Sequence, residues 1–168
     1  MDVSHQEELF SIWIKEYRHL LFKVVNIYAV DFADKEDLFQ EISIQVWHSA
    51  RRFKGHSAAS TWLYRVALNT AMTWSTREKK HRSEPLESVL VIAQESPAEI
   101  DERLAWLYEE VQKLGDIDKP LCLLLLEGYS YKEMAGILGM SESNIGVRIH
   151  RIKKHLTQRA SKQYHHEH

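Results

Sequence analysis

The sequence contains little cysteine, glycine or proline: 1, 6 and 3 residues, respectively, among 168. The single cysteine, Cys122, excludes an intramolecular disulfide and a multi-cysteine metal site in the monomer. So few glycines and prolines exclude a collagenous or low-complexity chain. The longest apolar run, residues 121–126, is far shorter than the roughly 20 residues of a membrane-spanning helix. These absences predict a folded, soluble protein that does not insert into a membrane.

Residues 1–8 lack the basic region and apolar run of a secretory signal peptide, so we expect a cytoplasmic location. The net charge of -2 does not by itself indicate a nucleic-acid partner, but the charges are unevenly distributed. Residues 51–82 carry eight Lys and Arg and one acid, whereas residues 83–102 carry six acids and no Lys or Arg. Residues 144–162 carry six Lys and Arg and no acid. Two basic segments in a nearly neutral chain favour two surfaces that contact a polyanion.

Apolar residues recur at helical spacing along most of the chain, and no segment shows the alternation of a strand. The spacing between Leu9 and Tyr28 predicts one long first helix. Asp34 and Asp37 predict the capped, acidic start of a second helix that runs to about Arg52. Its expected apolar face consists of Leu38, Ile42 and Val46, with Phe39 and Ile44 as further candidates. Ser60 or Thr61 predicts the start of a third helix.

A break in the periodicity divides the chain into two parts. Residues 83–95 are acidic, weakly periodic and interrupted by Pro85, which predicts a flexible linker. Residues 96–99, Ser-Pro-Ala-Glu, are typical of a helix start. The predicted fold is therefore all-α, with two small helical domains at residues 1–82 and 96–168.

Residues 131–156 have the pattern of a helix-turn-helix. Gly139 and Ser141 lie between the two predicted helices as turn and cap. On the second helix, four apolar residues share one arc: Ile145, Ile149, Ile152 and Leu156. The opposite arc consists of Ser143, Val147, His150, Arg151 and Lys154, with Asn144 and Arg148 on its flank. A helix with one apolar and one basic face is suited to the major groove of DNA.

Aromatic residues are interleaved with the basic residues of the first domain. Trp62, Tyr64 and Trp74 could stack on unpaired bases, or they could fill a helical core. Trp62 and Tyr64 cannot both face inward on one helix, so we expect at least one of them to be available.

Three stretches together resemble the extracytoplasmic-function (ECF) sigma factors of bacterial RNA polymerase. They are residues 37–47, which begin Asp-Leu-Phe-Gln-Glu, residues 61–69, Thr-Trp-Leu-Tyr-Arg-Val-Ala-Leu-Asn, and residues 128–156, which begin Gly-Tyr-Ser-Tyr-Lys-Glu. Their order and separation match as well, and the resemblance extends from about Leu9 to Arg159. It implies a dissociable polymerase subunit that directs promoter-specific transcription initiation without catalytic activity or a cofactor.

The resemblance also implies partners and contact residues. The clamp helices of the largest polymerase subunit would bind Asp37, Leu38, Gln40, Glu41 and Trp47. The minus-ten promoter element would be captured and melted by Phe53, Lys54, His56, Trp62, Arg65 and Asn69. The minus-thirty-five element would be read by Ser143, Asn144, Val147, Arg148, His150, Arg151 and Lys154. The flap of the second-largest subunit and an anti-sigma factor are further partners that the resemblance suggests, and the acidic linker would thread the RNA exit channel.

Four residues depart from the usual pattern of the family. Members usually carry Arg at the position of Leu68 and Asp near Thr73, so we expect the melting helix to lose a backbone contact. Members often carry a basic residue at the position of Gly146 and a small polar residue at that of Val147. The promoter sequence therefore cannot be transferred from other members.

Two other functions fit parts of the sequence. A stand-alone helix-turn-helix regulator would explain residues 131–156 but not residues 37–47. An enzyme is suggested only by the ten histidines, of which His165, His166 and His168 crowd one end, and no His-Glu-x-x-His pattern accompanies them. Cys122 lies in a leucine run, so we interpret it as a buried hydrophobic residue rather than a redox switch.

Overall fold

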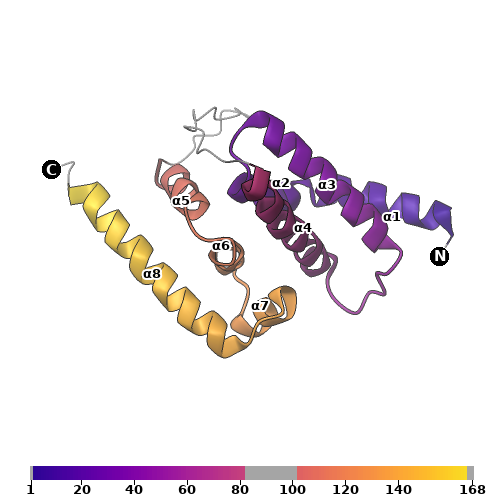
Figure 1. Ribbon diagram of the computed structural model, residues 1–168. Helices are drawn as coiled ribbons and strands as arrows, with labels where there is room; N and C mark the ends of the chain where they lie inside the picture. The colour runs from indigo at the N-terminus through magenta and orange to yellow at the C-terminus, as the bar shows by residue number, and fades with distance from the viewer. Residues whose placement is uncertain (1, 82–101, 166–168) are drawn as a thin grey trace. The chain divides into compact units, whose positions relative to one another are not determined.

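The computed structural model describes residues 2–81 and 102–165, which belong to two compact units, Met1–Ile100 and Asp101–His168. The described part of the first unit contains α1 (Val3–Glu16), α2 (Arg18–Tyr28), α3 (Phe32–Ala50) and α4 (Ala59–His81) (Figure 1). The described part of the second contains α5 (Glu102–Gln112), α6 (Asp118–Leu126), α7 (Tyr131–Leu138) and α8 (Glu142–His165). Helices and no strands occur in these ranges, which confirms the all-α fold. The expected linker, residues 83–95, and the expected helix start at residues 96–99 lie outside the described residues.

The predicted long first helix is wrong, because Tyr17 divides it into α1 and α2. Tyr17 has φ −107° and ψ 19°, outside the helical range. Its N–H donates to the carbonyl of Trp13 at 2.9 Å, and its carbonyl accepts from the N–H of Leu21 at 3.1 Å. Both helices continue the same apolar periodicity, so the stripe in the sequence did not reveal the single non-helical residue between them.

Helix α3 begins at Phe32, earlier than predicted, because its cap is Asp31 rather than Asp34. The Asp31 carboxylate accepts a hydrogen bond from the N–H of Asp34 at 2.8 Å. The predicted core residues of α3, Leu38, Ile42 and Val46, are fully buried. Ile44 is 52% exposed, so its predicted place in the core is wrong.

Helix α4 packs against α2 and α3 and supplies much of the core of the first unit. It begins at Ala59, so neither Ser60 nor Thr61 is its cap. Tyr64 and Trp74 are only 2% and 3% exposed. Leu68 is fully buried, so the apolar residue at this position fills the core of the first unit.

The second unit is built around an aliphatic core in which α8 packs against α6 and α7. The first turns of α8 meet α7 across a tight turn (Figure 1). Ser130 and Glu133 form a reciprocal capping box at the start of α7, with hydrogen bonds of 3.1 and 2.7 Å. Gly139 ends α7 with a left-handed φ of +66°, which glycine adopts at little cost. The helix-turn-helix is therefore confirmed.

Cys122 lies inside the aliphatic core on α6, 2% exposed. Desolvation by burial, with the nearby Asp118 carboxylate, raises the pKa of its thiol to about 11. A thiol with this pKa is almost wholly protonated at neutral pH and is a poor nucleophile. Cys122 thus behaves as a buried hydrophobic residue, as the leucine run predicted.

Among residues 2–81 and 102–165, no helix combines the length and the apolar character that a membrane span requires.

Candidate protein and nucleic-acid interfaces

The outer face of α3 is the first candidate surface, and it carries most of the residues expected to bind polymerase. Asp37 and Gln40 are exposed and Glu41 is half-buried. At 100° per residue, Ile44 falls on the same arc as these three polar side chains. Leu38 is fully buried, so its side chain supports this face from the core and does not take part in the surface. We call Asp37, Gln40, Glu41 and Ile44 the α3 face.

Sequence reasoning missed Ile44 as a surface residue because it was counted among the core candidates of α3. Helical spacing could have predicted its exposure, since Ile44 lies nearer to Asp37 than to Leu38 around the helix axis. An exposed isoleucine among polar side chains supplies apolar area that a partner protein can bury.

Two carboxylates of the α3 face are also bonded to α4. The indole N–H of Trp74 donates to the Asp37 carboxylate at 2.9 Å. The guanidinium of Arg77 pairs with the Glu41 carboxylate. Because Trp74 is buried, its N–H depends on Asp37 for a hydrogen-bond acceptor. Asp37 therefore contributes both to the outer surface and to the packing of α3 on α4.

Trp47 is half-buried and joins α1 to α3. Its ring meets the edge of Phe10 at a centroid distance of 5.4 Å and an interplanar angle of 88°. Its carbonyl accepts a hydrogen bond of 2.8 Å from the side-chain amide of Gln6, which is itself buried. Trp47 thus retains partial exposure at the edge of the α3 face.

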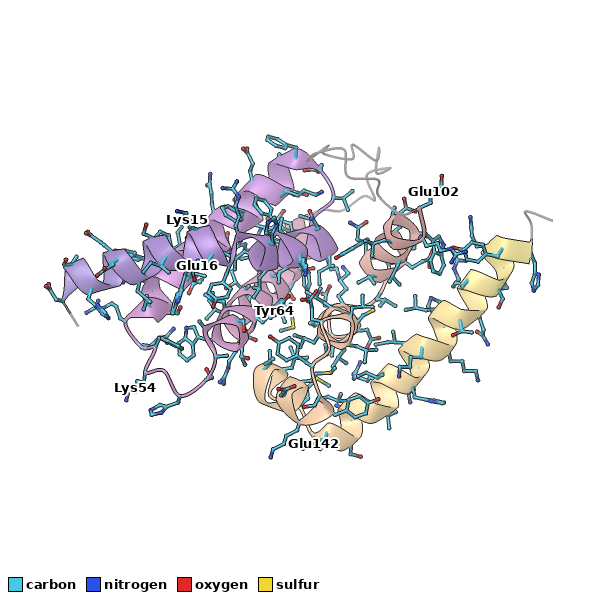
Figure 2. The ribbon with its side chains drawn as sticks, turned by 180° about the vertical axis from the view of Figure 1, so that it is seen from behind. Lys15, Glu16, Lys54, Tyr64, Glu102 and Glu142 are labelled. Atoms are coloured by element: carbon cyan, nitrogen blue, oxygen red, sulfur yellow. The ribbon has the colours of Figure 1, made fainter. Side chains whose placement is uncertain are left out.

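The loop between α3 and α4 has an aromatic base and a polar tip. Phe53 lies against the rings of Trp13 and Trp62, at centroid distances of 5.1 and 5.4 Å. Lys54 and His56 are exposed, and Figure 2 shows Lys54 pointing away from the helices. The rings hold the base of the loop in place, so Lys54 and His56 extend from an ordered base.

Of the three aromatic residues proposed to stack on bases, only Trp62 remains a candidate. Tyr64 and Trp74 are buried, whereas Trp62 is half-buried and donates from its indole N–H to the Ser49 hydroxyl at 3.2 Å. Arg65 and Asn69 are exposed one and two turns further along α4. We call Phe53, Lys54, His56, Trp62, Arg65 and Asn69 the loop and α4 surface.

The outer face of α8 is the third candidate surface. The core arc is as predicted for Ile145, Ile149 and Ile152, while Leu156 is half-buried. The expected DNA contacts Ser143, Asn144, Val147, His150, Arg151 and Lys154 are all exposed. We call these six residues the α8 face. Across residues 2–81 and 102–165, no hydrogen bond or ion pair engages the side chains of His150, Arg151 or Lys154.

Arg148 differs from the other residues predicted to contact DNA from α8. Its Nη1 lies 3.1 Å from a carboxylate oxygen of Asp118 at the start of α6. Its Nε is buried and has no hydrogen-bond partner among the described residues. The side chain therefore holds α8 against α6, and we do not count it in the α8 face.

A buried carboxylate fixes the second half of α8. Glu110 on α5 is 3% exposed and accepts hydrogen bonds from Arg159 at 3.2 and 3.3 Å and from Lys113 at 3.0 Å. The hydrogen bonds from Arg159 chiefly, and those from Lys113, lower the pKa of Glu110 despite its desolvation. The α5 helix is thereby attached to α8 well beyond the helix-turn-helix.

Two segments of the chain match known protein families. Residues 13–81 match Sigma-70 region 2, and residues 120–156 match Sigma-70, region 4. The first segment includes the α3 face and the loop and α4 surface, and the second includes the α8 face.

Individual proteins are similar over nearly the whole chain. The ECF RNA polymerase sigma factor SigX of Bacillus subtilis (strain 168) is 28% identical, over 89% of this chain and 84% of its own. The ECF RNA polymerase sigma-E factor of Escherichia coli (strain K12) is 26% identical, over 88% of this chain and 84% of its own. The solved sigma factor RpoE from Bartonella quintana, in complex with the anti-sigma factor NepR, matches with a TM-score of 0.67 at 19% identity. That match covers 89% of this chain and 94% of the solved one.

Proposed function

The chain belongs to the ECF sigma factors, which bind core RNA polymerase and direct promoter-specific initiation, and we propose that it acts through three surfaces. The α3 face binds the clamp helices of the largest polymerase subunit. The loop and α4 surface captures and melts the minus-ten element. The α8 face reads the minus-thirty-five element. The chain has no catalytic step of its own in this proposal and acts in the cytoplasm, with the polymerase.

The observation that carries the proposal is the separation of surface and core on α8. Within residues 143–165 the sequence contains no acid, and the exposed arc contains Arg151 and Lys154 opposite the buried isoleucines. Such a helix can enter the major groove, where its cations meet phosphates and the side chains of its first turns reach base edges.

The α3 face supports the polymerase contact by its charge and its apolar area. Asp37 and Glu41 offer carboxylates to basic residues of a partner, and Ile44 offers apolar surface beside them. Complementary charges orient two proteins as they meet, while buried apolar area contributes to affinity.

A regulator of the anti-sigma class is a further proposed partner. The solved relative from Bartonella quintana is described as a complex with such a protein. The flap of the second-largest polymerase subunit, which we propose to contact the second unit, would position the α8 face over the upstream promoter element.

Addition of the purified chain to core RNA polymerase tests the proposal as a whole. We expect run-off transcription from genomic fragments, with start sites that share an upstream and a downstream element. A stand-alone helix-turn-helix regulator would instead bind duplex DNA without polymerase and would initiate no transcripts. Tight, sequence-specific binding by the free chain, with no initiation by the mixture, would contradict the proposal.

Templates that are already melted test the loop and α4 surface. Replacing Lys54 and His56 with alanine should reduce open-complex formation on duplex promoters. The defect should shrink on templates unpaired at the minus-ten region, because unpairing costs a few kcal/mol that these templates no longer require. Lys15→Ala, an exposed cation on α1, is the matched control. An equal defect on both kinds of template would exclude a role in melting.

A further inference from the structure

The α8 face contains one side chain that cannot form a hydrogen bond. Val147 is 50% exposed, whereas Ser143, His150, Arg151 and Lys154 around it all carry polar groups. Single exposed apolar residues are common on protein surfaces and need no explanation by themselves. Val147, however, lies inside the arc that the basic residues of the helix define.

A second exposed apolar group lies over the residue that precedes Val147. Tyr131, at the start of α7, is 39% exposed. A Cβ atom built on Gly146 would lie 3.6 Å from Cε2 of its ring, so the ring rests over the backbone of Gly146. Gly146 and Val147 are successive residues, and we call Tyr131, Gly146 and Val147 the apolar patch.

The surroundings of the apolar patch indicate what covers it. Arg151 and Lys154 follow it on the same face, and no acid occurs between residues 143 and 165, so the charge of this face complements a phosphate backbone. In the major groove, the only apolar group on the base edges is the 5-methyl group of thymine. Resting on the function proposed above, we propose that the apolar patch reads a thymine of the upstream promoter element through this methyl group, with Val147 in contact.

The chemistry of the groove gives this contact its discrimination. When the thymine methyl group packs on Val147, it is removed from water and no hydrogen bond is lost. A cytosine at the same position carries an amino group in place of O4 and only hydrogen at C5, so it presents no methyl group to the valine. Burial of one methyl group corresponds to about a fourfold change in affinity, equivalent to ~0.8 kcal/mol.

Replacing thymine with deoxyuridine tests the contact because the two bases differ only in the methyl group. Promoter fragments are first selected by the holoenzyme, formed from the full chain and core polymerase, from a pool randomised in the upstream element. Each selected thymine is then replaced singly with deoxyuridine, and affinity is measured by competition. We expect one position, or two adjacent ones, at which the replacement weakens binding about fourfold.

A double-mutant cycle assigns that loss to Val147. In holoenzyme carrying Val147→Ala, the deoxyuridine penalty at that position should disappear while the other positions are unchanged. Leu126→Ala is the matched control, because Leu126 is also 50% exposed in the same unit but lies outside the α8 face. With this variant, the loss of affinity on deoxyuridine replacement should be the same at every position as with the parent chain. Cytosine at the sensitive position should bind weakly, and 5-methylcytosine should recover about fourfold.

The outcomes separate this inference from the function on which it rests. Failure of the mixture to select DNA or to initiate transcription would overturn the proposed function. Selection of an upstream element with no thymine, or with thymines that all tolerate deoxyuridine, would overturn only the methyl contact. A deoxyuridine penalty that survives Val147→Ala would overturn the role of Val147.

Discussion

The α3–α4 pair and the α7–α8 pair both present polar side chains to partners, but they differ in how those side chains relate to the core. On α3, Asp37 and Glu41 are bonded to Trp74 and Arg77 of α4. On α8, the exposed Arg151 and the buried Ile149 belong to opposite arcs. Binding and stability should therefore be separable by mutation on α8 and coupled on α3.

The cores of the two pairs differ as well. The first unit contains edge-to-face contacts among Trp13, Phe53 and Trp62, and its tryptophan and tyrosine side chains carry polar groups that need partners. The core between α6 and α8 is built mainly from leucine and isoleucine side chains, which need no polar partners. An aliphatic core needs no bonds from the α8 face, although Arg148 and Arg159 elsewhere on α8 pair with Asp118 and Glu110.

The largest effect that we expect is the loss of stability on truncating the core arc of α8. Ile149 is fully buried, so Ile149→Ala should destabilise the second unit by about 2–5 kcal/mol through the cavity that it leaves. Calorimetry or chemical denaturation of the full chain measures the change. A stable Ile149→Ala chain that no longer binds promoter DNA would break the proposed separation of the two arcs.

The next effect concerns the other arc of the same helix. Arg151→Ala should weaken initiation at promoters that depend on the upstream element by about 1–3 kcal/mol if Arg151 meets a base edge, and by less if it meets phosphate. The unfolding midpoint should stay nearly unchanged, because the side chain is exposed. Loss of a base contact should also relax the preference at one position, whereas loss of a phosphate contact should weaken binding to all sequences about equally and reduce its salt dependence. Unfolding of the second unit by Arg151→Ala would contradict the assignment.

A smaller effect tests the coupling on α3. Asp37→Ala leaves the buried indole N–H of Trp74 without its acceptor, so it should cost about 1–2 kcal/mol of stability and also weaken binding to core polymerase. Gln40→Ala is the control, since Gln40 is exposed on the same face, and it should weaken binding with little change in stability. Unfolding curves and core-binding titrations of the two variants give the comparison. Equal unfolding midpoints for both would show that the α3 face is as separable as the α8 face.

The smallest effect is a gain in stability at Gly146. Alanine has a higher helix propensity than glycine, and its Cβ would meet the Tyr131 ring at an ordinary contact distance of 3.6 Å. Gly146→Ala should therefore stabilise the second unit by about 0.5–1 kcal/mol. Gly139→Ala should do the opposite, because Gly139 has a φ of +66°. Thermal unfolding of both variants measures the direction of each change in stability. A destabilising Gly146→Ala would show that the Tyr131 ring cannot accommodate a methyl group.

Local patterns in the sequence were sufficient to predict much of the structure of the second unit. The spacing of Ile145, Ile149 and Ile152 predicted which side of α8 is buried, because helical periodicity alone decides it. Gly139 likewise predicted the turn between α7 and α8. These features depend on residues within a few positions of one another.

Features that depend on distant residues were not predictable in this way. The partner of Arg148 is Asp118, and the partner of Asp37 is Trp74, 37 residues away. No local pattern indicates either pairing, so sequence reasoning did not predict that Arg148 and Asp37 also bond to distant helices. The break at Tyr17 was missed for another reason, since the apolar stripe continues through it.

The ring cluster of Trp13, Phe53 and Trp62 also has a spectroscopic consequence. Of the five tryptophans, four belong to the first unit and only Trp106 belongs to the second. Intrinsic emission therefore reports chiefly on the first unit. Because Trp62 is the half-buried tryptophan of the cluster, an unpaired base stacked on it would quench its emission. If Trp62 binds an unpaired base as proposed, its emission would report the moment at which promoter bases leave the duplex.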